Sequence, residues 1–316
     1  MTRATADLLL LAAALIWGLA FVGQATAMEH MGPLTFSGAR FLLAALVVAP
    51  FAAMESRRMP AIPRNRAPAL IGIGTVFFLG VVTQQLGLLS TSVTNAGFLT
   101  ALYVIMVPAL AWAVQHVATR RAAARMPMLA SPVPASPLAE TPVKVNGFVW
   151  PAAAISFAGT FLLGGGRIGG LNWGDGLVIV AAFFWAVQIL ALGALAYDLR
   201  RPLTIAFIQY AVTAALGLGA GFIFETPTLA GVFAAWRELA YTGVVSGGIA
   251  FTLQSIAQAH TPPSDAAIIV SSESLFAAAF GALLLGDRLG AAGWSGAALV
   301  LAAVLLVQLG PAYLRR

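Results

Sequence analysis

Two charged residues lie deep inside long apolar stretches of this 316-residue chain. One is Arg40, and the other is Glu273, the one acidic residue well inside such a stretch, since Asp265 lies near a boundary. An arginine at this depth can hold a carboxylate through two parallel hydrogen bonds. Its structural alternative is to pair with Glu273 or with carbonyl groups at a helix end. Glu273 either takes up a proton or hydrogen-bonds across the bundle, and a single carboxylate without a His or Asp relay does not establish proton coupling.

Neutral aromatic and amide side chains indicate a binding cavity beside these charges. Trp17, Phe21 and Gln24 are spaced i, i+4 and i+7, so they share one face of a helix. Trp185 and Gln188, spaced i and i+3, do the same on a second helix. A face of rings and amides suits a zwitterion with an apolar side chain. The alternative for each residue is a packing role or an interhelical hydrogen bond.

The predicted substrate-binding residues combine the two charges with these rings and amides. They are Trp17, Phe21, Gln24, Arg40, Gln84, Gln85, Tyr103, Trp185, Gln188, Gln254 and Glu273, with Gln258 as a further uncharged donor. No catalytic residue, metal or cofactor is expected, because the chain has no Cys and only three His. An intramembrane enzyme is therefore a remote alternative, since it needs a nucleophile and base or a metal set at one depth.

The composition requires that lipid surround the elements that carry these residues. The chain is 60% hydrophobic and 9% charged, whereas a soluble domain carries roughly 25% charged residues. Backbone groups in lipid must be hydrogen-bonded internally, which leaves helices or closed barrels. The apolar runs are long and do not alternate with period two, which argues against a barrel. The predicted fold class is an all-α integral membrane protein.

Apolar windows bounded by Pro, Gly, Arg or polar clusters predict ten transmembrane helices. Their expected spans are 7–27, 34–54, 67–89, 94–115, 146–163, 175–197, 202–223, 238–259, 265–285 and 291–310. With the N-terminus in the cytoplasm, thirteen of the seventeen basic residues lie on the cytoplasmic side, namely Arg3, Arg57, Arg58, Arg64, Arg66, Arg120, Arg121, Arg125, Lys144, Arg200, Arg201, Arg315 and Arg316. Only Arg167, Arg237 and Arg288 lie outside. This distribution agrees with the positive-inside rule and predicts that both termini are cytoplasmic.

An internal repeat organises the predicted helices. Pro33-Leu34-Thr35 recurs as Pro202-Leu203-Thr204 after 169 positions, and Trp17 and Asn95 correspond to Trp185 and Asp265 at nearly the same offset. Each half then holds five helices, and because five is odd, the halves enter the membrane with opposite orientation. The expected segments are a first repeat over 1–115 and 146–163, a Pro-rich cytoplasmic loop over 116–145, and a second repeat over 174–316. Inverted repeats of this kind build transporters with a substrate site near the midplane.

Short motifs in the same order resemble the drug/metabolite transporter superfamily, in particular its EamA group. They are Ile16-Trp17-Gly18-Leu19-Ala20-Phe21-Val22, Ala39-Arg40-Phe41-Leu42-Leu43-Ala44-Ala45, Asn95-Ala96-Gly97-Phe98-Leu99-Thr100 with Val107-Pro108, and Ser272-Glu273-Ser274-Leu275 with Leu285-Gly286-Asp287-Arg288. Ser274 stands where the family usually has proline. The helix kink that this proline would cause is therefore not expected from the resemblance. Within the superfamily the chain is most similar to the YddG-type amino-acid exporters.

The resemblance implies a carrier that exports small organic solutes, chiefly neutral and aromatic amino acids, across a bacterial inner membrane by alternating access. The expected partners are such a solute and the lipid bilayer, without nucleic acid, because the basic residues form no continuous stripe. Monomer and homodimer both stay open. A multidrug carrier would use Glu273 with a cation–π cage of aromatic rings, and a carrier of phosphorylated sugars would need more than one deep arginine. A receptor or scaffold is a further alternative.

Overall fold

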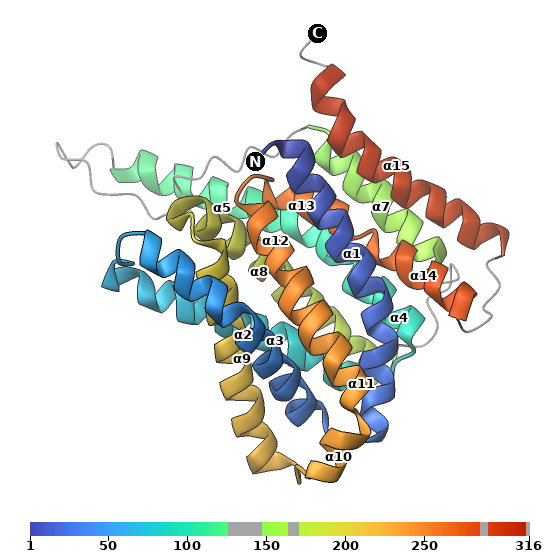
Figure 1. Cartoon of the computed structure of the whole chain (residues 1–316). Helices are drawn as coiled ribbons and strands as arrows, with labels where there is room; N and C mark the ends of the chain where they lie inside the picture. The colour runs from blue at the N-terminus through green and yellow to red at the C-terminus, as the bar shows by residue number, and fades with distance from the viewer. Residues whose placement is uncertain (126–146, 164–170, 285–289, 314–316) are drawn as a thin grey trace.

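The computed structural model describes residues 1–125, 147–163, 171–284 and 290–313, and within these ranges helices are the only regular secondary structure (Figure 1). Eight of the helical segments are long and apolar enough to cross a membrane. The helices are α1 (Arg3–Thr26), α2 (Pro33–Arg58), α3 (Ala67–Gly87), α4 (Val93–Thr100), α5 (Tyr103–Arg125), α7 (Val149–Leu163), α8 (Trp173–Leu199), α9 (Pro202–Phe224), α10 (Leu229–Ala234), α11 (Trp236–Leu239), η3 (Ala240–Ala250), α12 (Phe251–Gln258), α13 (Pro263–Val270), α14 (Glu273–Leu284) and α15 (Ala291–Tyr313).

The starts of several helices follow local sequence signals. Pro33, Pro202 and Pro263 stand at the beginning of α2, α9 and α13, where a missing N–H costs nothing and the fixed φ favours the first turn. Asn172 and Asp175 form a reciprocal capping box at the start of α8. These signals explain why the predicted beginnings of the second and seventh spans agree closely with the structure.

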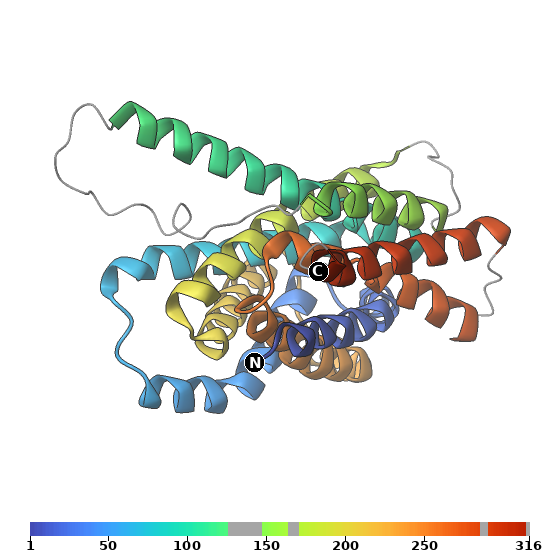
Figure 2. The ribbon, with the colours of Figure 1, turned by 90° about the horizontal axis from the view of Figure 1, so that it is seen from above.

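The helices form one bundle in which α1 and α8 each pack against helices distant in sequence. The long helix α1 contacts α12, α13 and α14, while α8 contacts α3, α4 and α5. Figures 1 and 2 show α7 and α15 side by side, with α1 beginning and α15 ending toward the same end of the bundle. This end is called the N-terminal end below.

Two predicted spans, 94–115 and 265–285, are each interrupted by a short break in the first half of the span, so neither is one unbroken helix. The first still contains a segment that is long and apolar enough to cross a membrane, Asn95–Val117. The first break, at 101–102, separates α4 from α5, and the second, at 271–272, separates α13 from α14. Both α4 and α13 have eight residues, and each begins 170 positions from the other. At the second break, Ser271, Ser272 and Ser274 donate hydroxyl hydrogen bonds to carbonyl groups three residues earlier, in competition with regular helical bonding.

The predicted span 238–259 is also irregular. Its first half is the π-helical segment η3, and only its second half, α12, is α-helical. Two glycines let η3 pack tightly on α2: a Cβ on Gly243 would lie 2.9 Å from the Arg40 carbonyl oxygen, and one on Gly247 would lie 3.1 Å from the Ala44 Cβ. This close packing fixes the backbone from which Arg40 projects.

Helices α2 and α9 pair along their lengths and cap each other. The Glu225 carboxylate accepts hydrogen bonds from the backbone of Leu34 and Thr35 at the start of α2. The Glu55 carboxylate accepts corresponding bonds from Leu203 and Thr204 at the start of α9. A carboxylate at a helix N-terminus satisfies free N–H groups and interacts favourably with the helix dipole. The repeated Pro-Leu-Thr motif thus marks two reciprocally capped helix starts.

The predicted loop over 116–145 begins too early. Helix α5 continues to Arg125, so the first ten residues assigned to the loop are helical. In both views the last turns of α5 project beyond the neighbouring helices (Figures 1 and 2). The rest of the predicted loop, 126–145, lies outside the described ranges.

Candidate functional site

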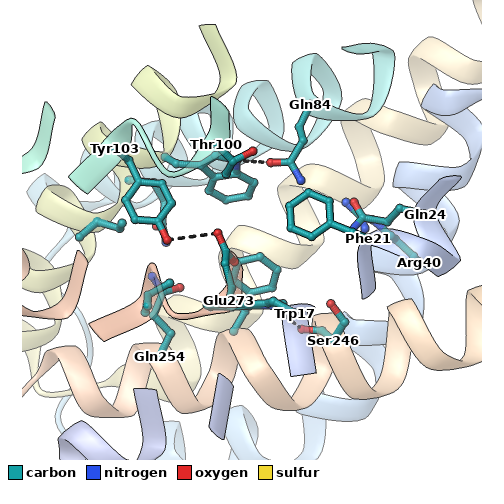
Figure 3. Close-up of a pocket in the computed structure, with 15 residues that line it drawn as sticks. Trp17, Phe21, Gln24, Arg40, Gln84, Thr100, Tyr103, Ser246, Gln254 and Glu273 are labelled. Atoms are coloured by element: carbon teal, nitrogen blue, oxygen red, sulfur yellow. Dashed lines mark hydrogen bonds between the residues drawn. The ribbon is translucent and has the colours of Figure 1, made fainter. Parts of the chain in front are cut away.

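A cavity lies inside the bundle, bordered by both broken helices. It encloses about 530 Å³ of space, a volume that includes space open to the surroundings. Aromatic, amide and hydroxyl side chains dominate its wall, together with one basic and one acidic residue. The lining residues are Trp17, Phe21, Gln24, Arg40, Gln84, Thr100, Tyr103, Trp185, Gln188, Ile189, Ser246, Phe251, Gln254, Val270 and Glu273 (Figure 3).

The structure brings ten of the eleven predicted site residues to this cavity. The exception is Gln85, which is fully buried beside it and donates from Nε2 to the Gln24 carbonyl oxygen at 3.0 Å. Gln85 therefore connects α3 to α1 and does not line the cavity. The adjacent Gln84 does line it, because neighbouring residues of a helix point about 100° apart. Gln258 likewise lies outside the lining set and donates to the Ile189 carbonyl oxygen at 2.9 Å.

Arg40 is buried in the cavity wall without a bonded partner. Its exposed fraction is 4%, and it forms no hydrogen bond or ion pair with any described residue. Its guanidinium carbon lies 4.9 Å from the Phe41 ring centroid and 5.4 Å from that of Phe36, which gives cation–π stabilisation. The alternative that Arg40 pairs with Glu273 or with helix-end carbonyls is therefore wrong for this structure.

Glu273 is the first residue of α14, directly after the break. Its Oε1 accepts a hydrogen bond from the Tyr103 hydroxyl at 3.1 Å, and Tyr103 is the first residue of α5, directly after the other break. Figure 3 shows this pair apart from Arg40. The cavity therefore presents a cationic and an anionic side chain at separate places.

Aromatic rings form a continuous apolar part of the cavity wall. Phe251 contacts both tryptophans that were predicted to line the site. Its ring centroid lies 4.5 Å from that of Trp17 and 5.7 Å from that of Trp185. Phe77 extends the cluster, 5.4 Å from Trp185. The Trp185 indole donates to Gln84 Oε1 at 2.7 Å, and the Trp17 indole donates to the Ser246 carbonyl oxygen at 3.3 Å. Both indoles are thereby held in orientation, as buried Trp N–H groups require.

Several polar atoms at the cavity wall have unused hydrogen-bonding capacity. The amide oxygens of Gln188 and Gln254 and the Thr100 hydroxyl are buried without a partner among the described residues. Gln188 donates one hydrogen bond from its Nε2 to Gln209 at 2.9 Å, while its acceptor oxygen stays free. Buried polar groups normally find a partner. These free groups can therefore bind a polar solute.

Sequence reasoning missed Thr100, Ile189, Ser246, Phe251 and Val270. One of them carried a usable signal, because Phe251 lies one turn before Gln254 on the same helical face. Ile189 and Val270 look like ordinary core residues in the sequence, and only the packing of their helices places them at the cavity. In the part of the chain that the structure describes, no cluster of His, Cys, Asp or Glu could hold a metal ion.

Comparison with known proteins shows which family this chain belongs to. A model of the EamA-like transporter family matches residues 4–130 and 172–309. An uncharacterized transporter of Archaeoglobus fulgidus is 31% identical over 309 residues, which cover 97% of this chain and 87% of the relative. One crystal structure of another protein superposes with a TM-score of 0.70 over all of both chains at 18% identity, a likeness that concerns the fold alone. The chain belongs to the EamA-like transporter family, within the drug/metabolite transporter superfamily, and is a multi-pass membrane protein.

Proposed function

We propose that this transporter exports amino acids, chiefly neutral and aromatic ones, across a bacterial inner membrane by alternating access, as YddG-type exporters do. The substrate would place its carboxylate at Arg40, its ammonium group at Glu273 and its side chain against Trp17 and Trp185. Phe251 would complete the apolar wall between the two indole rings. Export as the direction rests on the family resemblance.

The unpartnered guanidinium of Arg40 carries this proposal. A charged side chain at the bilayer centre costs about 2.5–3.5 kcal/mol on insertion scales, and no described residue offsets that cost with a bond to Arg40. A substrate carboxylate would supply the missing partner. Hydrogen bonds to charged groups contribute about 1.5–3 kcal/mol each, which is enough to favour solutes that carry this group.

The proposed topology has ten membrane spans in two inverted five-helix repeats, over 1–115 with 146–163 and over 174–316, and both termini in the cytoplasm. It is supported by α4 and α13, which have equal length and correspond at an offset of 170. The reciprocal caps by Glu55 and Glu225 add a second correspondence. The start of α1 and the end of α15 lie toward the same end of the bundle, as is expected for an even number of spans (Figure 1).

Two alternatives fit the cavity less well. A cationic drug would use Glu273 and the aromatic rings, but Arg40 lies in the same cavity and would repel it. A phosphorylated sugar carries two negative charges, whereas Arg40 is the one basic residue among the described residues that line the cavity. The pairing of one positive with one negative group favours a zwitterion.

Counterflow in proteoliposomes that contain only this purified protein tests the proposal. Liposomes are preloaded with a mixture of amino acids and exposed to labelled threonine, phenylalanine or methionine. We expect uptake above that of empty liposomes, competed by neutral amino acids. Absence of exchange with every amino acid, from protein shown to be folded, would overturn the amino-acid assignment. Exchange with a quaternary ammonium dye or a sugar phosphate would then establish the corresponding alternative.

A further inference from the structure

The hairpin formed by α12 and α13, Phe251–Val270, is bounded by irregular backbone on both sides. Each limb has eight helical residues. The first limb follows the π-helical segment η3, and the second ends at the break over 271–272. Hinges are short stretches at element ends that absorb changes in φ and ψ, and π-helical turns often occur at functional positions. The hairpin therefore has a hinge-like element at the base of each limb.

The hairpin reaches from the cavity to the N-terminal end of the bundle. Near its base, Phe251, Gln254 and Val270 line the cavity. Near its tip, Thr261 and Asp265 contact the first turns of α1. Movement of the hairpin about its base would therefore connect the cavity with that end.

Arg3 ties the hairpin tip to α1. Its Nη2 lies 2.7 Å from Asp265 Oδ2, and its Nε lies 3.0 Å from Asp7 Oδ1. The Thr261 hydroxyl also donates to Asp7 Oδ1 at 3.0 Å. Asp7 and Asp265 are both 5% exposed. One arginine thus bridges two buried carboxylates, which come from α1 and from the hairpin.

The opposite end of the bundle has the same hydroxyl–carboxylate bond without the ion pair. There Thr91, 170 positions before Thr261, donates to Asp175 Oδ1 at 2.9 Å. The position that corresponds to Asp265 is Asn95, which is exposed, and the position that corresponds to Arg3 is Leu171, which is 62% exposed. Among the residues that the structure describes, the charged contact exists at the N-terminal end alone.

We propose that the α12–α13 hairpin is a gate that closes the cavity toward the N-terminal end, and that Arg3 is the latch that holds this gate shut through Asp265. This inference rests on the proposed function, because a gate has a role only in a carrier. The latch makes closure at this end more favourable than closure at the opposite end. Loss of the Arg3–Asp265 ion pair therefore shifts the carrier toward the state that is open at the N-terminal end.

Double electron–electron resonance on the protein in liposomes tests the latch without any substrate. The chain contains no Cys, so spin labels attach only where cysteines are introduced. Ala4→Cys on α1 and His260→Cys at the hairpin tip both replace exposed residues. We expect one short distance in this doubly labelled parent. Arg3→Gln and Asp265→Asn should each add a population that is longer by about one helical turn, ~5 Å.

Two control variants keep the test specific. Arg66→Gln breaks the 3.0 Å ion pair with Asp198 of α8, which does not join α1 to the hairpin, and should leave the distances unchanged. Arg3→Lys retains the charge and should retain most of the short population. Unchanged distances in both Arg3→Gln and Asp265→Asn, with both proteins folded, would overturn the latch, as would an equal change in Arg66→Gln. Missing counterflow in the parent would overturn the proposed substrate but not these distances.

Discussion

The Tyr103 hydroxyl donates to the Glu273 carboxylate at 3.1 Å, and the two residues occupy corresponding positions, each first after the break in its helix and 170 positions apart. The bond therefore joins α5 to α14 where both helices are irregular. It also holds the one carboxylate of the described cavity wall in place. A substrate ammonium group that binds Glu273 would act directly on this junction.

Tyr103→Phe should slow transport while the protein still reaches the membrane. The substitution leaves the Glu273 carboxylate without a hydrogen-bond donor among the described residues, which costs about 1–3 kcal/mol of stability. Counterflow rate and thermal unfolding in detergent measure the two effects. Glu273→Gln keeps an acceptor for Tyr103 and removes the charge, so it should unfold near the parent temperature and still lose affinity for amino acids. Equal transport by Tyr103→Phe and parent would contradict a role for this bond.

Arg40→Gln should weaken binding of carboxylate-bearing solutes about tenfold or more, because each charged hydrogen bond contributes about 1.5–3 kcal/mol and 1.4 kcal/mol is a factor of ten. Arg40→Lys should recover part of the affinity, since it keeps the charge but loses the planar fork. The solute concentration at half-maximal counterflow is the measurement.

The matched control is Arg237→Gln, because Arg237 is an exposed residue of the short helix α11, lies over the Trp236 ring and does not line the cavity. An unchanged half-maximal concentration in Arg40→Gln would refute the proposed carboxylate contact.

Trp17→Ala and Trp185→Ala should reduce transport while membrane abundance stays intact. Each removes a ring from the wall around Phe251, so affinity for phenylalanine should fall more than affinity for threonine. Transport per molecule, normalised to protein in the membrane, is the measurement. Trp294→Ala is the control, since Trp294 is 67% exposed. Lower abundance with unchanged transport per molecule would show that the two tryptophans serve packing.

Glu225→Ala and Glu55→Ala should each destabilise the α2–α9 pair by about 0.5–2 kcal/mol, the range found for lost helix caps. The two caps lie at opposite ends of the pair, so their effects should add in the double variant. Unfolding in detergent, followed by circular dichroism, measures the change. Glu29→Ala, at an exposed position, should be neutral. A stability loss in Glu29→Ala as large as in Glu225→Ala would point to net charge and not to capping.

Much of the cavity wall could be predicted because helical periodicity is local. Trp17, Phe21 and Gln24 share a face as soon as α1 is a helix, and all three line the cavity. Gln85 shows the limit of this reasoning, since nothing in the sequence separates it from Gln84, and only the packing of α3 against α1 does so. Phe251 is the converse case, a residue that the packing of α12 makes central.

The sequence by itself determined that the chain is helical and spans a membrane, because apolar runs of this length in lipid require every backbone group to be bonded locally. It also predicted which charged residues lie inside the long apolar stretches. Only the tertiary structure decided that Arg40 has no bonded partner, that Tyr103 meets Glu273, and that Arg3 meets Asp265. The physical reason is that each of these contacts, or its absence, depends on how helices distant in sequence pack against one another, whereas helix formation depends on neighbours along the chain.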